Sequence, residues 1–96
     1  MASNQSTCYV IAYDIPDDRR RTKGHKILSG FGTWTQYSLF ECFLSKKELI
    51  QLRAKLAKHL NETQDSVRFY PLCAACLDKV ETVGGEPPKE DIAFIV

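Results

Sequence analysis

The sequence has no long hydrophobic run: none of its apolar stretches approaches the ~18–20 residues that a membrane-spanning helix requires. Residues 1–7 carry neither a basic region nor a long apolar one, so no signal peptide is expected. Internal repeats and low-complexity tracts are also absent. These absences exclude a membrane protein and a repeat protein, and they favour a cytoplasmic location.

The chain also lacks an excess of charge of one sign. Its 13 basic and 12 acidic residues leave a formal net charge of +1, which argues against a uniform polycation. The charges are nevertheless unevenly distributed, because a basic block contrasts with residues 81–91, which are acidic with only Lys89 as a counter-charge. The basic block consists of Arg19, Arg20, Arg21, Lys23 and Lys26.

Without an export route, the four cysteines are expected to be reduced thiols rather than a disulfide framework. Cys8 and Cys42 lie in apolar, strand-like runs and should behave as small hydrophobic residues. Cys73 and Cys76 have the spacing of half a zinc site, but the other cysteines and histidines are distant in sequence. A thioredoxin-like redox pair would need a βαβ context that is absent, so two reduced thiols in a turn are favoured.

The 96 residues and an apolar content of 44% predict one small domain that spans residues 1–96. Residues 1–7 are polar and are expected to be frayed. Residues 84–88 predict a loop, and the chain closes with an apolar, β-forming segment at 92–96. An apolar strand left on an open edge would favour aggregation, so we expect it to pair, with a partner subunit as the natural candidate.

The first strand organises the rest of the prediction. Residues 8–13 form an unbroken apolar and aromatic run, which is typical of a central strand covered on both faces. Pro16 cannot donate to a sheet ladder, so the strand must end before it, with Asp14 at its carboxyl end. Proteins with α/β layers commonly bind ligands at such ends. Asp14 therefore either binds a ligand or bonds to the backbone of the turn around Pro16.

A first helix is expected at about residues 18–31, with Asp17 or Asp18 as its N-cap and Gly30 and Gly32 at its end. Its opening turns are almost entirely cationic. This half of the helix must therefore face solvent or a polyanion.

A second helix is indicated by the capping box of Ser45 and Glu48. The two histidines, His25 and His59, fall on the two helices and are expected to be exposed. Apolar residues at helical spacing predict the core-facing stripe of the second helix. The stripe consists of Leu49, Ile50, Leu52, Leu56, Ala57 and Leu60.

The remaining strands follow from β-branched and aromatic residues. Thr33–Leu44 predicts either one bent strand or a hairpin with its break near residues 37–38. Ser66–Leu72 predicts a strand with alternate side chains on opposite faces, and residues 73–83 predict a turn and a short strand. The order β-α-β(β)-α-β with a trailing strand is the ferredoxin-like pattern of an α+β sandwich.

Three motifs in this order carry a resemblance to a known family. The run YDIPDDRRR at residues 13–21 follows the buried strand, QYSLFE occupies residues 36–41, and DSVRFYPL at residues 65–72 precedes Cys73 and Cys76. Together they make the chain, over about residues 8–96, resemble the CRISPR-associated protein 2 family, one of the two core CRISPR adaptation proteins.

The resemblance implies a ferredoxin-like homodimer that binds nucleic acid and exchanges its C-terminal strands. It also implies an integrase partner, with which the dimer would hold foreign DNA for insertion as a spacer. Members of the family are described as Mg²⁺-dependent endonucleases on single-stranded RNA or double-stranded DNA. The resemblance therefore implies a Mg²⁺ cofactor and an endonuclease activity.

The resemblance carries individual residues as well. Asp14 is carried over as the metal ligand and catalytic acid, and the further catalytic positions are Tyr13, Arg19, Arg21 and Phe40. The basic block is predicted from its own charge to bind nucleic acid, because that charge is concentrated on one helix and dimer symmetry would double it. Two positions depart from the family pattern: Lys23 replaces an arginine of many members, and Trp34 occupies a strand position that is often basic.

Magnesium usually takes one or two carboxylates and completes its coordination with water and phosphate oxygens. One Asp14 per chain is a thin site, but a two-fold axis near the strand end would pair two of them. Three alternatives remain open: a non-catalytic DNA-binding scaffold, an RNA-binding module that uses Trp34 and Phe40, and a metal-carrying domain that uses Cys73 and Cys76.

Overall fold

The computed structural model describes residues 5–89, so the expected terminal strand at residues 92–96 lies outside the described residues. Within residues 5–89, no helix is long and apolar enough to cross a membrane. The elements in chain order are β1 (Thr7–Asp14), α1 (Asp18–Ser29), β2 (Thr33–Gln36), β3 (Leu39–Leu44), α2 (Lys46–His59), β4 (Ser66–Leu72) and α3 (Ala74–Asp78).

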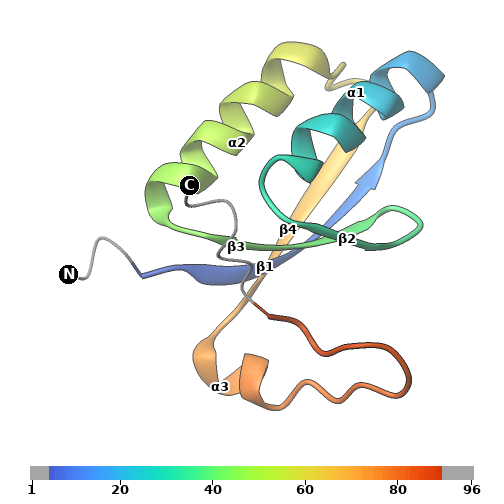
Figure 1. The fold of residues 1–96 in the computed structure, drawn as a ribbon. Helices are drawn as coiled ribbons and strands as arrows, with labels where there is room; N and C mark the ends of the chain where they lie inside the picture. Colours follow the sequence, from blue (N-terminus) through green and yellow to red (C-terminus); the bar gives the residue numbers. More distant parts are fainter. Residues whose placement is uncertain (1–4, 90–96) are drawn as a thin grey trace.

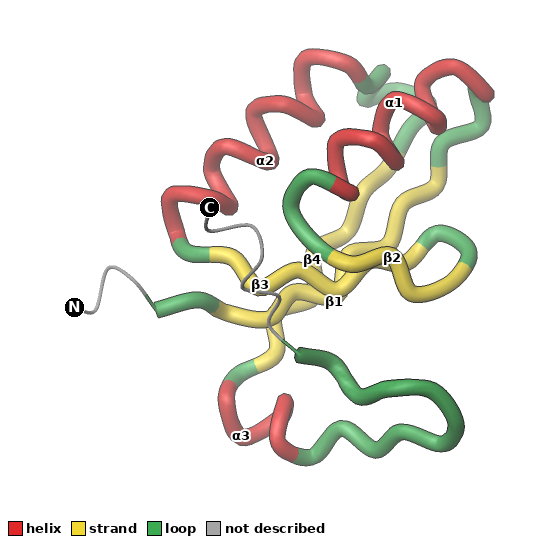
Figure 2. The backbone as a smooth tube through the Cα atoms, viewed as in Figure 1, coloured by secondary structure: helices red, strands yellow, loops and turns green. Residues whose placement is uncertain are grey.

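The strands form one antiparallel sheet in the order β2-β3-β1-β4, with β1 in its centre. In this register Ile11 of β1 lies opposite Phe40 of β3 and Phe69 of β4. Helices α1 and α2 cover one face of the sheet, whereas α3 and the chain that follows it lie on the other side (Figures 1 and 2). The predicted α+β, ferredoxin-like fold is therefore confirmed.

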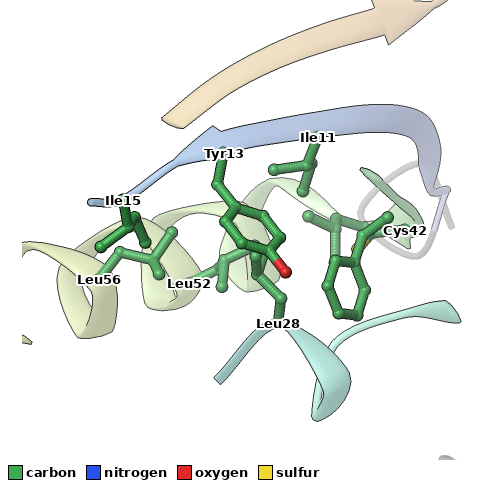
Figure 3. Close-up of a cluster of buried hydrophobic side chains, with 9 residues drawn as sticks. Ile11, Tyr13, Ile15, Leu28, Cys42, Leu52 and Leu56 are labelled. Atoms are coloured by element: carbon green, nitrogen blue, oxygen red, sulfur yellow. The ribbon is translucent and has the colours of Figure 1, made fainter. Parts of the chain in front are cut away.

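The core lies between the sheet and the two long helices. Because side chains alternate along a strand, Ile11 and Tyr13 of β1 point toward α1 and α2, as Figure 3 shows. Cys8, Val10, Ala12 and Asp14 consequently share the opposite face. The prediction that helices or other layers cover both faces of β1 is thus wrong for the Asp14 end, which is exposed. The buried cluster consists of Ile11, Tyr13, Ile15, Leu28, Phe40, Cys42, Leu44, Leu52 and Leu56.

Helix α1 begins as predicted, because the Asp17 side chain accepts a hydrogen bond from the Arg20 backbone N–H at 2.9 Å. The helix ends at Ser29, two residues earlier than expected, with Gly30 as its C-cap. Gly32 takes part in the helix end, because its N–H donates to the Leu28 backbone oxygen at 3.1 Å, and it also meets β3. A Cβ added to Gly32 would lie 2.6 Å from the backbone oxygen of Glu41, so the chain entering β2 packs directly on β3.

Gly32→Ala is expected to destabilise the fold by about 1–3 kcal/mol, because a methyl group there would overpack this contact with β3. Gly30→Ala is the matched control: its added carbon would lie 3.4 Å from the Ile27 backbone oxygen, and its φ of −77° suits any residue. Urea unfolding followed by circular dichroism measures both free energies. Equal stabilities of the two variants would contradict the close approach at Gly32.

The segment between the helices is a hairpin, with the break where the sequence placed it. Tyr37 occupies the turn between β2 and β3 with a φ of 46°. Helix α2 starts with both hydrogen bonds of the predicted capping box between Ser45 and Glu48. Leu52 and Leu56 are buried, but Ile50 and Ala57 are exposed, so their assignment to the core stripe was wrong.

Strand β4 is confirmed, with Val67 and Phe69 packed against the core and Arg68 and Tyr70 on the opposite face. The predicted short strand within residues 73–83 is wrong, because the chain forms α3 there and then continues without regular structure to Lys89. The Cys73 side chain, at the N-cap of α3, accepts a hydrogen bond from the backbone N–H of Cys76. This bond satisfies one of the free N–H groups at the helix start and favours a helical turn.

Candidate metal and nucleic-acid site

Asp14 is the last residue of β1, where it pairs with Ser66 of β4. Its side chain is exposed on the face of the sheet opposite α1 and α2. The turn after β1 is capped by Asp17 instead. Within residues 5–89, the Asp14 carboxylate has no hydrogen bond from a protein donor, so its oxygens are available to water or a cation.

Tyr13 and Phe40 lie on the helix side of the sheet, away from Asp14. Tyr13 is 7% exposed and Phe40 is fully buried, with their rings 6.1 Å apart. The Tyr13 hydroxyl lies 3.0 Å from Nδ1 of His25, and burial raises the pKa of Tyr13. The structure therefore divides the predicted catalytic set, because these two side chains belong to the core and cannot reach the surface that carries Asp14.

His25 is half-buried, so its predicted exposure was wrong; His59 is exposed as predicted. The His25 ring packs edge-on to Phe40 at 5.0 Å and to Trp34 at 6.2 Å. This histidine therefore joins α1 to the aromatic side chains of the sheet. Sequence spacing could not reveal this contact, because the partners come from three separate elements.

Arg20 is engaged within the chain. Its Nε donates to the Asp65 carboxylate at 2.8 Å, and one Nη donates both to the second Asp65 oxygen at 3.2 Å and to Gln64 at 2.9 Å. Asp65 also accepts from the backbone N–H of Asn61. This bidentate pair fixes the start of α1 to the loop before β4, and it leaves Arg20 the least available member of the basic block.

The ion pair between Asp65 and Arg20 should make the free energy of unfolding depend on pH. Hydrogen bonding to Arg20 lowers the pKa of Asp65, so its contribution is fully present above the ordinary Asp pKa of about 4 and is lost as pH falls through the lowered value. Urea midpoints of wild type and Asp65→Asn should therefore differ at pH 7 and converge in acid. Glu62→Gln, an exposed acid in the same loop, is the control. A difference that is constant with pH would contradict the ion pair.

Arg21 and Arg19 do not share the contacts of Arg20 with the loop before β4. One Nη of Arg21 donates to the backbone oxygens of Ile15 at 3.0 Å and Pro16 at 3.2 Å, and the other pairs with Asp18. Arg21 thus holds the turn that follows Asp14, which is a positioning contact. Arg19 is exposed, and no hydrogen bond or ion pair of its side chain is present within residues 5–89.

Lys23 and Lys26 of the basic block lie on α1 beside two lysines of α2. Together they line a cavity of about 320 Å³ between the two helices, here called the basic groove, and no acidic residue among residues 5–89 lines it. Sequence reasoning missed the contribution of α2, although cations three and four residues apart would have placed them on one helix face. The groove is lined by Lys23, Lys26, Ile27, Lys55, Lys58 and His59.

The face of the sheet that carries Asp14, here called the open face, is largely apolar. Val10 of β1 lies between Glu41 of β3 and Tyr70 of β4, and burial raises the pKa of Glu41. Residues 80–89 pass on this side, where they, β2 and Glu41 line a cavity of about 980 Å³. Further apolar members of the open face, all half-buried, are Ala12, Leu39, Phe43 and Leu72.

The cysteines occupy two kinds of environment. Cys8 and Cys42 are buried, as predicted, and burial raises the pKa of Cys42 to about 12. Cys73 and Cys76 are exposed free thiols at the start of α3. Within residues 5–89, no group of three or more metal-ligating side chains comes together.

Fold and site together define a ferredoxin-like α+β sandwich with an exposed acid where its central strand ends and a cationic groove on its helical side. A profile of the family described as CRISPR associated protein Cas2 matches residues 7–80. The chain belongs to this family, as its motifs predicted.

Known relatives agree with this assignment. A protein of Synechocystis sp. named CRISPR-associated endoribonuclease Cas2 3 is 52% identical over 80 residues, which cover 83% of this chain and 86% of that protein. The crystal structure of a hypothetical protein from Thermus thermophilus matches with a TM-score of 0.75 and 38% identity, covering 86% and 96% of the two chains. A chain of a partial Cas6-RT-Cas1–Cas2 complex matches with a TM-score of 0.70 and 26% identity, covering 84% and 88%.

Proposed function

We propose that this protein acts in CRISPR adaptation as a homodimer that binds nucleic acid beside an integrase, and that it cleaves RNA or DNA with Mg²⁺ bound at Asp14. The relative in Synechocystis is named an endoribonuclease, and the structural match in the partial Cas6-RT-Cas1–Cas2 complex supports an integrase partner. The observation that carries the proposal is the exposed Asp14 carboxylate at the rim of an apolar sheet face, which has no protein donor among residues 5–89.

A second copy of the chain is the occupant that best fits the open face. Its apolar side chains come from three strands, and Tyr70 is 48% exposed. Two such faces packed together would remove this apolar surface from water, which stabilises a dimer by roughly 25 cal/mol for each Å² buried. Because Asp14 lies on the same face, a two-fold axis through it would bring the two acids toward each other.

The residues present fit Mg²⁺, which binds through one or two carboxylates and keeps several waters. Asp14 would hold the ion, alone or with its symmetry mate. When bound, the ion would lower the pKa of a coordinated water and neutralise the phosphate under attack. Arg21 holds the turn after Asp14 through two backbone oxygens, so it would keep the strand end in place. Tyr13 and Phe40 would support β1 from the core rather than touch the substrate.

The basic groove and Arg19 are proposed to hold the phosphate backbone. Affinity is expected to fall about 100-fold between 50 and 200 mM salt, which corresponds to about four phosphate contacts, and to depend little on base sequence. Fluorescence anisotropy with labelled duplex DNA and single-stranded RNA of several sequences measures this dependence. Affinity that is constant across this salt range would contradict phosphate binding.

A charge-reversal pair tests the groove itself. Lys23→Glu with Lys26→Glu should weaken binding at least tenfold and reduce the salt dependence, because two phosphate contacts are replaced by repulsion. Lys46→Glu with Lys47→Glu changes the net charge equally at exposed positions of α2 outside the groove, and should bind nearly as wild type. Equal losses in both pairs would show that only the overall charge matters.

A non-catalytic scaffold is the second candidate. It is favoured by the burial of Tyr13 and Phe40, which leaves only Asp14, Arg19 and Arg21 of the predicted catalytic residues outside the core. A scaffold requires the basic groove and the open face but not the acid. The two candidates therefore differ in the role of Asp14 alone.

A further inference from the structure

Cys73 and Cys76 stand where β4 meets α3, and the function proposed above uses neither of them. Both are exposed free thiols. The Cys73 sulfur accepts a hydrogen bond from the backbone N–H of Cys76 at 3.3 Å. The two thiols are therefore three residues apart at the N-cap and third position of α3, a spacing that places them on the same side of the helix start.

The hydrogen bonds give the two thiols different reactivities. Donation by Cys76, first from its backbone N–H and then from its side chain, lowers the pKa of Cys73. The same side-chain contact raises the pKa of Cys76. Because the thiolate is the nucleophile in thiol–disulfide exchange, Cys73 is the attacking sulfur and Cys76 the resolving one.

The other two cysteines provide an internal contrast. Cys8 is 2% exposed and Cys42 is fully buried, and desolvation raises the pKa of both thiols. Neither is accessible to a reagent in the folded chain. Any thiol chemistry of the native protein is thus confined to the pair beside α3.

We infer that Cys73 and Cys76 form a redox-active dithiol, which exchanges with small-molecule disulfides and closes into an internal disulfide. The Cys73 thiolate attacks one sulfur of the disulfide, whose S–S bond breaks and releases one thiolate. Cys76 then loses its proton to water and attacks the Cys73 sulfur, which expels the second thiolate. The protein gives up two electrons and two protons, and the small disulfide is reduced to two thiols.

The Cys73–Cys76 disulfide would form at the start of α3, a helix that is not stable in isolation. Helix α3 has five residues, far fewer than an isolated helix needs to be stable in water. Half-buried Leu77 is its main attachment, beside Phe43 of β3 and Leu72 of β4. A cross-link over the first turn restricts the unfolded forms of this segment, so the oxidised protein should hold α3 more persistently.

The test treats the reduced, full-length protein with oxidised glutathione and follows intact mass, peptide maps and hydrogen exchange. The expected product has lost two hydrogens, carries a Cys73–Cys76 cross-link, and exchanges its amides more slowly in residues 74–79 but not in α1. An unchanged mass, or a cross-link between two chains in place of the internal one, would overturn the inference.

Single substitutions separate the two roles. Cys76→Ser should stop at a glutathione adduct on Cys73, and Cys73→Ser should lose the internal cross-link, while Cys8→Ala should still form it. Circular dichroism checks that each variant is folded. The peptide map of the wild-type protein tests the cross-link even if a variant fails to fold. Glutathione adducts on Cys8 or Cys42 as fast as on Cys73 would also overturn the assignment.

Discussion

Replacing Asp14 with asparagine should lower Mg²⁺-dependent cleavage at least about 100-fold, because even the outer partners of a metal ligand are worth roughly 10–100-fold. Asparagine has nearly the same size, but its neutral amide is a poorer ligand for a hard cation. The Asp14 side chain is exposed and has no protein donor within residues 5–89, so the fold should not change. Nucleic-acid affinity without divalent cations should be retained.

The measurement compares cleavage of labelled single-stranded RNA and duplex DNA with Mg²⁺ and with a chelator. Asp78→Asn, which neutralises an exposed acid on α3, is the matched control and should cleave as wild type. Sedimentation of both variants reports whether the dimer persists. Wild-type cleavage by Asp14→Asn would exclude the metal site, and chelator-resistant binding without any cleavage would identify the scaffold.

Leu52→Ala is expected to cost about 2–5 kcal/mol of unfolding free energy, the largest effect on stability among the substitutions considered. Leu52 is fully buried under the sheet beside Ile11 and Leu28, where the lost side chain would leave a cavity (Figure 3). Ile50→Ala on the same helix is the control. Ile50 is 62% exposed, so its truncation should change stability by less than about 0.5 kcal/mol.

Urea unfolding curves of the two α2 variants, measured at one pH and compared with wild type, give both free energies. The contrast matters because sequence periodicity assigned Ile50 and Leu52 to the same core stripe. A similar loss of unfolding free energy at both positions would mean that the exposed side of α2, which carries Ile50, is covered in solution.

The fold could be predicted because its signals are local. The capping box of Ser45 and Glu48, the Asp17 cap and the proline after β1 each act within a few residues of the element they define. The prediction failed after β4 for an equally local reason that composition does not reveal. Residues 74–78 form α3 because the Cys73 sulfur caps a helical turn, whereas composition alone suggested a strand.

The candidate site divides in the same way. Asp14 was placed correctly at a strand end, because Pro16 fixes where β1 stops. The separation of Tyr13 from Asp14 follows from strand alternation and could have been read from the sequence. The pairing of Arg20 with Asp65 could not, since 45 residues separate them and only the folded chain brings the start of α1 to the loop before β4.

Trp34 has a consequence for how the molecule can be observed. It is the only tryptophan, it is 51% exposed on β2, and its indole N–H donates to the Tyr37 backbone oxygen at 2.9 Å. Its ring lies 6.2 Å from the His25 ring, on the face of the sheet that α1 covers. The intrinsic fluorescence therefore originates where the edge strand β2 meets α1, and an emission shift toward the blue would signal that this contact has become less accessible to water, with no added dye.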